Sequence, residues 1–159
     1  MTGKRRKARE CALQILFQLE FGDESIEEVF RDFWKHQRVS PEVKEYCEIL
    51  VRGISQNKLE IDNLIQQASR NWRLDRMAVV DRNVLRIAVY ELKSEKNLPV
   101  PVIIDEAIEI ARKFSGQEAA IFINGLLDAI SHSLRPETAA REKEQIKRFN
   151  KSDKEEVDK

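Results

Sequence analysis

Three features of the sequence predict an all-α fold. Apolar residues recur at spacings of three and four along most of the chain, which is the period of a helix with a buried face. No segment sustains the alternation of apolar and polar residues that is typical of a half-buried strand. Helix-capping patterns stand at several boundaries between the apolar segments. Together these features predict a compact bundle of about seven helices.

The first two helices are defined by a double apolar stripe and a capping box. The first is expected from about Lys4 to Phe21, with one stripe at Ala8, Ala12, Ile15 and Leu19 and another at Leu13, Phe17 and Phe21. Two stripes indicate a helix buried over much of its circumference. Ser25 followed by Glu28 is a capping box, which predicts that the second helix begins there.

Two further caps predict the third and fourth helices. Ser40 with Pro41 provides an N-cap and a proline at the first helical position. Gly53 lies in the last turns of this third helix, where it is expected to permit close packing. Asn57 with Glu60 is another capping pattern and predicts the start of the fourth helix.

A stiff break at residues 97–101, which contain two prolines, separates the fifth predicted helix from the sixth and seventh. The fifth helix, from about Asp75 to Ser94, is strongly apolar and is expected to be central. The sixth carries apolar residues at three-four spacing, namely Ile104, Ala107, Ile108, Ala111 and Phe114. Residues 115–118 form a capping-box pattern for the seventh. Gly125 inside that helix costs about 1 kcal/mol relative to alanine, so we expect a close backbone approach there, either to another helix, which is the favoured interpretation, or to a ligand.

Length and composition indicate one folded domain with a charged tail. The chain has 159 residues, of which 42% are hydrophobic and 35% charged, enough apolar surface for a core in a single domain. Apolar residues become sparse near the C-terminus. We therefore expect a helical domain at residues 1–134 and, at 135–159, a tail that is at most a solvated helix and otherwise disordered.

No apolar stretch approaches the roughly 20 residues needed to cross a bilayer, and polar residues interrupt any signal-peptide pattern at the N-terminus. Cys11 and Cys47 are isolated within apolar helical patterns. Their spacing suits neither a disulfide framework nor a metal site. The expectation is two buried, reduced thiols in a cytoplasmic protein.

The sequence offers little support for an enzyme. Phosphate-binding, nucleophile-elbow and metalloprotease motifs are missing, and His36 and His132 are expected to have structural or surface roles. The acidic residues Asp105, Glu106 and Glu109 are best explained as a solvated helix face paired with Arg112 and Lys113. We expect no catalytic residue, no cofactor and no bound metal.

The most distinctive feature is a run of cations at residues 4–9, Lys-Arg-Arg-Lys-Ala-Arg, here called the basic head. The chain is otherwise balanced, with 28 basic and 28 acidic residues. Arg5 and Arg9 are four residues apart and share a helix face, so the head is expected to present a fixed row of guanidinium groups to a phosphate backbone. Replacing Arg5, Arg6 and Arg9 by alanine should then leave thermal unfolding nearly unchanged. The alternative is a solvated, frayed N-terminus.

Charged residues within the fifth helix leave two interpretations open. Asp81, Arg82 and Arg86 form either an exposed charged face, with Arg86 paired internally, or a surface that docks another protein.

Four segments, taken in order, resemble one protein family. They are Arg5–Glu10, Asp81–Leu92, Ile104–Ala111 and Phe122–Asp128. Each is weak alone, but the ordered set, which extends from about Lys4 to Ile130, is similar to the NusB family of bacterial transcription antitermination factors.

The resemblance implies a helical bundle in two subdomains without enzymatic activity. It also implies binding to the box A RNA of ribosomal RNA leaders, together with the small-subunit ribosomal protein NusE, and action on RNA polymerase. The RNA-binding residues that it implies are Arg5, Arg6, Lys7, Arg9, Glu118 and Phe122, and the partner-binding residues are Phe17 and Asp81. Phe122 either stacks on RNA or packs in the core.

Two alternatives stay open beside that resemblance. One is a helical scaffold that binds only protein. The other is a NusB-like accessory domain of an RNA methyltransferase system, although the chain leaves no room for the cofactor-binding sheet of the methyltransferase itself.

Overall fold

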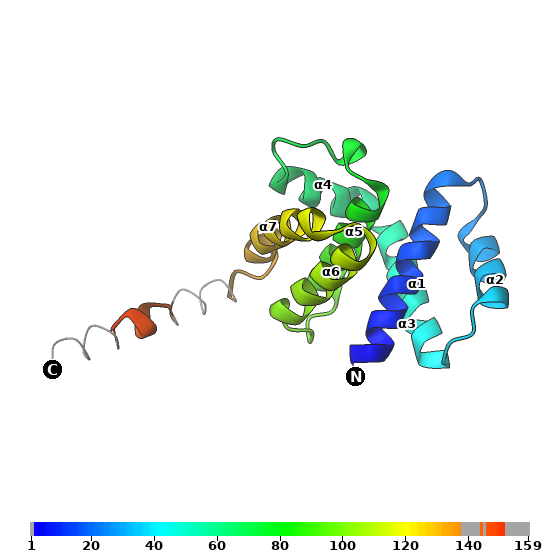
Figure 1. Ribbon diagram of the computed structural model, residues 1–159, viewed down its shortest axis with the longest axis horizontal. Coiled ribbons are helices and arrows are strands. Elements are labelled where there is room, and N and C mark those ends of the chain that lie inside the picture. The colour runs from blue at the N-terminus through cyan, green and yellow to red at the C-terminus, as the bar shows by residue number, and fades with distance from the viewer. Residues whose placement is uncertain (1, 138–143, 145, 152–159) are drawn as a thin grey trace.

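The computed structural model describes residues 2–137, 144 and 146–151. From residue 2 to residue 134 it contains seven α-helices and one 3-10 helix (Figure 1), and none of the described residues lies in a strand. The prediction of an all-α bundle is confirmed. The elements are α1 (Thr2–Phe21), α2 (Ile26–His36), α3 (Pro41–Gln56), α4 (Lys58–Ala68), η1 (Leu74–Arg76), α5 (Val79–Ser94), α6 (Val100–Phe114) and α7 (Gln117–Leu134).

Two of the predicted caps form as expected. At the start of α2, the Ser25 hydroxyl accepts the Glu28 N–H at 3.2 Å, and the Glu28 carboxylate accepts the Ser25 N–H at 3.3 Å. At the start of α3, the Ser40 hydroxyl accepts the Val43 N–H, and Pro41 occupies the first helical position. These contacts satisfy amide donors that have no partner within the helix.

Two other predicted boundaries differ. The Asn57 side chain does not cap α4, because its amide donates instead to the Gly53 carbonyl at 2.8 Å and so completes the end of α3. The N-cap of α7 is Gly116, not Ser115, and no side chain caps this helix. Gly116 has φ of 112°, a conformation that favours glycine, so a tight turn replaces the capping box. The helix expected from Asp75 is also divided, into η1 and α5.

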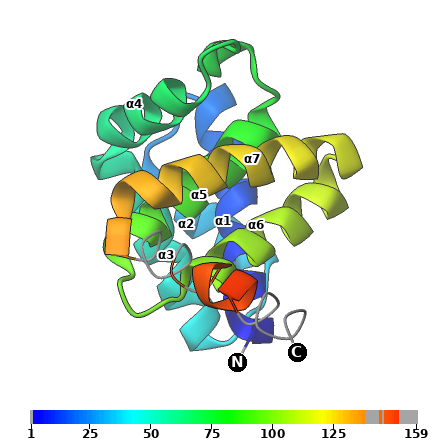
Figure 2. The ribbon, with the colours of Figure 1, turned by 90° about the vertical axis from the view of Figure 1, so that its left-hand side faces the viewer.

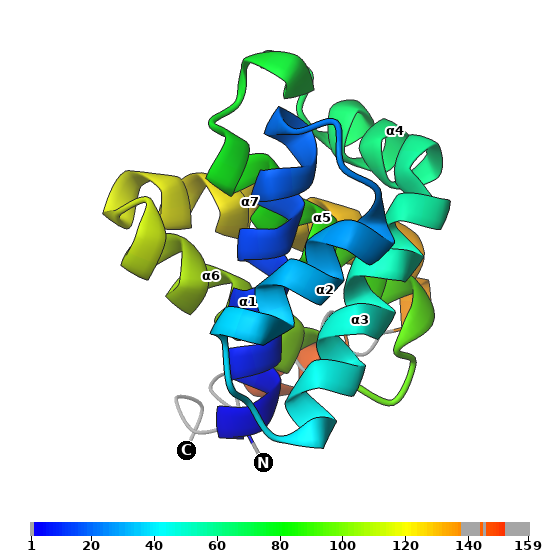
Figure 3. The same cartoon turned by 90° about the vertical axis from the view of Figure 1, so that its right-hand side faces the viewer.

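The helices form two groups that share one hydrophobic core. Helices α1, α2 and α3 make the N-terminal group, and α4 to α7 make the C-terminal group (Figures 1 and 3). Within the C-terminal group, α5 contacts α4, α6 and α7, and it also packs against α1 and α3 of the N-terminal group. Helix α7 crosses α5 on the outer side of the C-terminal group (Figure 2). The predicted central position of α5 is confirmed, since Leu85, Val89 and Leu92 are fully buried.

Glycine marks one close helix contact, and it is not the one expected in α7. A methyl group added at Gly53 would overlap the ring of Tyr90, so α3 and α5 approach each other there because residue 53 has no side chain. The predicted packing of Gly53 is confirmed. The prediction for Gly125 is wrong, because this residue is exposed and an added methyl group would meet no atom within 4 Å.

The folded domain extends beyond its predicted end at residue 134. Arg135 is 5% exposed, and its guanidinium donates to the carbonyls of Leu92, Glu95 and Leu98, at 3.1, 3.0 and 2.6 Å. It thereby binds carbonyls in the last turn of α5 and in the segment that follows this helix. The prediction of a solvated or disordered tail falls largely on residues 138–143, 145 and 152–159, which lie outside the described ones.

Candidate nucleic-acid interface

The basic head is the first part of α1, and it packs against α3. Lys4, Arg5, Arg6 and Lys7 are exposed, whereas Arg9 is buried. Lys4 forms an ion pair with Glu42 of α3, and the Arg5 guanidinium lies 4.2 Å from the centre of the Tyr46 ring. A cation over an aromatic face is held by the ring quadrupole. The head is therefore an ordered helical surface, and the alternative of a frayed N-terminus finds no support.

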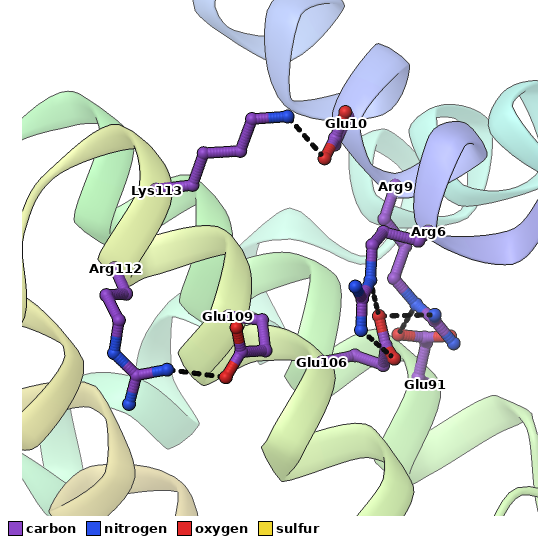
Figure 4. A network of polar contacts seen from close by, with 8 residues as sticks. All are labelled: Arg6, Arg9, Glu10, Glu91, Glu106, Glu109, Arg112 and Lys113. Atoms are coloured by element: carbon purple, nitrogen blue, oxygen red, sulfur yellow. Dashed lines mark hydrogen bonds and ion pairs between the residues drawn. The ribbon is translucent and has the colours of Figure 1, made fainter. Parts of the chain in front are cut away.

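Arg9 does not belong to the exposed row that was predicted for it. Its side chain is 3% exposed and its Nε and Nη2 atoms each donate to the Glu91 carboxylate at 2.9 Å (Figure 4). Burial opposes the charge of Arg9, but the bonds to Glu91 outweigh it and raise the pKa of the guanidinium. Tyr46 also donates to Glu91. The expectation that alanine at Arg5, Arg6 and Arg9 leaves unfolding unchanged is therefore wrong, because Arg9 is part of the interior.

Arg6 is shared between the surface and a buried carboxylate. Its side chain is 45% exposed, yet its Nε and Nη2 atoms donate to the two oxygens of Glu106 at 2.9 Å each. This bond lowers the pKa of Glu106, with Arg9 contributing from 3.7 Å. The predicted solvated acidic face is thus wrong for Glu106, whose side chain is 7% exposed and whose carboxylate joins α6 to α1. Glu109 does pair with Arg112 as expected, at 2.5 Å.

A hollow of about 350 Å³ opens beside the basic head, between α1 and α3. It is lined by Lys4, Arg5, Glu42, Glu45, Tyr46 and Ile49. Ile49 is 42% exposed and the Tyr46 ring is half-buried, so apolar surface adjoins the exposed cations. Single-stranded nucleic acids use this combination of positive charge for the backbone and flat or apolar surface for the bases.

The predicted contact residues of α7 are both at the surface. Glu118 is exposed in the first turn, and Phe122 is 37% exposed one turn later. The core is formed by other side chains of this helix, among them Ile123 and Leu127, which are fully buried. The interpretation of Phe122 as a core residue is therefore wrong, and its ring is open to a ligand.

The two predicted partner-binding residues lie on helices that an ion pair connects. Phe17 of α1 is 45% exposed, and its ring centre is 4.9 Å from that of Phe21. Asp81 lies in the first turn of α5 and is half-buried. Glu20, one turn after Phe17, pairs with Arg82, which follows Asp81 directly. The structure thereby brings the last turns of α1 next to the start of α5.

Arg86 is internal rather than part of an exposed charged face. It is 6% exposed and donates to Asp62 of α4 at 2.8 and 3.1 Å and to Glu20 of α1 at 2.6 Å. Its predicted internal pairing is confirmed. Burial opposes ionisation of Glu20, but bonds from Arg82 and Arg86 prevail and lower its pKa.

The two cysteines belong to the hydrophobic core. Cys11 and Cys47 are both buried free thiols, and burial raises the pKa of each. Among the described residues, no three His, Cys, Asp or Glu side chains are grouped in a way that could hold a metal ion. None of the described helices has both the length and the apolar character required to cross a membrane.

The sequence and the fold are similar to those of known proteins of one family. The model of the NusB family matches residues 6–132. A transcription antitermination protein NusB of Anaeromyxobacter dehalogenans is 46% identical over 137 residues, which cover 86% of this chain and 96% of that protein. A T. maritima NusB structure is 42% identical, with a TM-score of 0.73 over 80% of this chain and 89% of the other.

A second similar structure shows antitermination factors NusB and NusE in complex with dsRNA. That chain is 27% identical, with a TM-score of 0.76, and the match covers 84% of this chain and 99% of the other. Family model, relatives and solved structures thus agree over nearly the whole described helical domain. The chain belongs to the NusB family.

Proposed function

We propose that this protein is a non-enzymatic transcription antitermination factor that binds the box A RNA of ribosomal RNA leaders together with NusE and acts on RNA polymerase. The observation that carries the proposal is the basic head, which is helical, exposed and fixed to α3 and α6 by named contacts. The relative's name, transcription antitermination protein NusB, and the neighbouring complex of NusB, NusE and RNA support it.

The proposed RNA surface consists of two parts. Arg5, Arg6 and Lys7 supply exposed positive charge for phosphates on α1. Phe122 supplies an exposed ring on α7, with Glu118 beside it at the start of that helix. Bases of single-stranded RNA stack on such rings, and polar groups contact their edges. Arg9 takes no part in contact, because it is buried behind the head.

An electrophoretic mobility shift with box A RNA, repeated over a range of salt, tests this surface. Each phosphate neutralised on a single strand contributes about −0.7 to the slope of log affinity against log salt, so Arg5, Arg6 and Lys7 should give a slope of about −2. The triple alanine variant should lose most of it and remain folded. Alanine at Lys35 and Arg38, exposed cations in the last turn of α2 and just beyond it, is the control. A triple variant with wild-type affinity and slope would refute the assignment.

The proposed NusE surface is formed by Phe17 and Asp81. A carboxylate suits a partner that is itself a basic, RNA-associated protein. Asp81→Lys should weaken NusE binding about tenfold or more in calorimetry, while binding to RNA alone stays unchanged or improves. Because one Asp81 oxygen is buried, Asp81→Asn serves as a milder second variant, and circular dichroism checks the fold of both. If both folded variants bind NusE normally, the docking surface lies elsewhere.

A further inference from the structure

The C-terminal end of α6 carries an exposed cation next to an exposed aromatic ring. Lys113 is 61% exposed at its side chain, and Phe114 is 41% exposed. The Lys113 ammonium lies 5.2 Å from the centre of the Phe114 ring. The periodicity of α6 predicts Phe114 as a core residue and Lys113 as a partner of acidic neighbours on its own helix, so neither exposure nor this pairing was expected.

Lys113 reaches across to α1, directly behind the basic head. Its Nζ atom is 3.1 Å from Oε1 of Glu10, the residue that follows Arg9. Figure 4 shows the Lys113 side chain extending from α6 toward Glu10, with Arg6 on the same helix as Glu10, whereas Arg112 points to Glu109 instead. One N–H of the ammonium is used by Glu10, and a lysine has three donors. Lys113 therefore retains the capacity to bind a phosphate.

Phe114 is also adjacent to the part of the proposed RNA surface on α7. Only Ser115 and Gly116 separate α6 from α7, and the positive φ of Gly116 makes the connection a tight turn. Ile121 is 64% exposed, next to the half-exposed Phe122. The end of α6 thus lies between the basic head on one side and the start of α7 on the other.

We infer that Lys113 and Phe114 form a further RNA-contact site, in which Lys113 binds a phosphate and Phe114 stacks on a base of single-stranded RNA. The inference rests on the RNA binding proposed above. The site at the end of α6 would connect the two parts of the proposed RNA surface, the exposed cations on α1 and the ring of Phe122 on α7. A ring without polar atoms stacks on any base, so the site contributes affinity with little sequence preference. Positive charge beside the ring and continuity with the basic head favour RNA over an apolar peptide.

Substitutions at Phe114 separate stacking from packing. Phe114→Leu keeps an apolar side chain but removes the flat ring, and it should weaken box A RNA binding about fivefold to a hundredfold, in the range measured for loss of base stacking on an aromatic residue. Phe114→Trp should bind at least as well as wild type. Trp72→Leu, an exposed aromatic residue 55% accessible between α4 and η1, is the matched control and should leave affinity unchanged.

Lys113 is tested by the salt dependence of binding. Lys113→Gln should reduce the slope of log affinity against log salt by about 0.7, the contribution of one phosphate on a single strand. Lys35→Gln on α2 should leave the slope unchanged. As a direct readout, RNA with 5-iodouridine at successive positions should photo-crosslink to Phe114 in the wild type, and the crosslinked peptide is identified by mass spectrometry.

The outcomes distinguish this site from the proposed function itself. If the wild-type protein does not bind RNA even at low salt, both the proposed RNA-binding function and this further site are refuted. If the wild type binds RNA through Arg5, Arg6 and Lys7, but Phe114→Leu and Lys113→Gln bind like wild type and no crosslink maps to residue 114, only this inference is overturned. Thermal melting of each variant confirms that a loss of affinity does not arise from unfolding.

Discussion

Breaking the buried ion pair between Arg9 and Glu91 should destabilise the protein strongly. The side chains are 3% and 1% exposed and are joined by two 2.9 Å hydrogen bonds. Removing one partner of a buried pair typically costs about 3–5 kcal/mol, because the other charge stays buried without compensation. Folded domains of this kind are stable by only about 5–15 kcal/mol. Either single substitution should therefore remove a large part of the stability.

The two partners should not be equivalent. Arg9→Met leaves the Glu91 carboxylate with the Tyr46 hydroxyl as its remaining side-chain partner, so its cost should approach the upper end of that range. Glu91→Met leaves the Arg9 guanidinium 3.7 Å from the Glu106 carboxylate, so part of the compensation remains and the cost should be lower. With both residues replaced by methionine, no unpaired charge is left. The double variant should be at least about 2 kcal/mol more stable than Arg9→Met alone.

Urea unfolding followed by circular dichroism measures the four free energies of unfolding in this cycle. The double variant, if folded, also tests whether Arg9 contacts RNA. Since Arg9 is buried, its loss should leave the salt slope of RNA binding at the wild-type value. A cost below about 1 kcal/mol for Arg9→Met, with additive effects of the two substitutions, would refute the buried pair. A salt slope reduced by about 0.7 in the double variant would show that Arg9 binds a phosphate after all.

Three further predictions concern stability and reactivity. Gly53→Ala should destabilise the fold by about 1–3 kcal/mol, because the added methyl group overlaps the ring of Tyr90. Gly125→Ala, with open space around it, should instead stabilise α7 by about 0.5–1 kcal/mol. Urea midpoints that shift in the same direction for both variants would contradict this pair of predictions. The pKa of Glu106 is lower in the folded protein than its unfolded value of about 4.5, so the ionised carboxylate stabilises the fold at pH values above 4.5. This contribution should be lost as the pH falls below 4.5 and through the folded pKa. Glu106→Gln should therefore make the free energy of unfolding less dependent on pH in the acid range. Cys11 and Cys47, buried and with raised pKa, should react with a thiol reagent only after unfolding, and rapid labelling of the native protein would show that the core is open.

The elements that the sequence predicts best depend on short-range physics. The caps at Ser25 and Ser40 act within three residues, so their residue types are sufficient to locate them. Gly125 shows the limit of such reasoning. Its neighbours on the same helix face, Asp128 and His132, are exposed polar residues, and this pattern would have indicated solvent rather than a helix contact.

Buried charges were predicted least well, because their partners are distant in sequence. Arg9 and Glu91 are 82 residues apart, and Arg6 and Glu106 are 100 apart. Composition of the basic head indicates charge but cannot show which cation faces inward. One signal was present: Arg9 precedes Leu13 by four residues and shares a helix face with it, and Leu13 is buried although Phe17 and Phe21 further along that face are exposed. A charge on an apolar stripe is a reason to expect a buried partner.

A cationic helix N-terminus needs the carboxylates that surround it here. Cations near the N-terminus of a helix are repelled by its dipole and by one another, so an isolated basic head would fray. In this structure each of three other helices supplies an acidic side chain to the head: Glu42 from α3, Glu91 from α5 and Glu106 from α6. These ion pairs fix the direction of α1 while Arg5, Arg6 and Lys7 stay exposed. The order of the proposed RNA surface therefore depends on carboxylates that are assigned no contact with RNA. Because these carboxylates come from both groups of helices, both groups must be folded for the surface to exist.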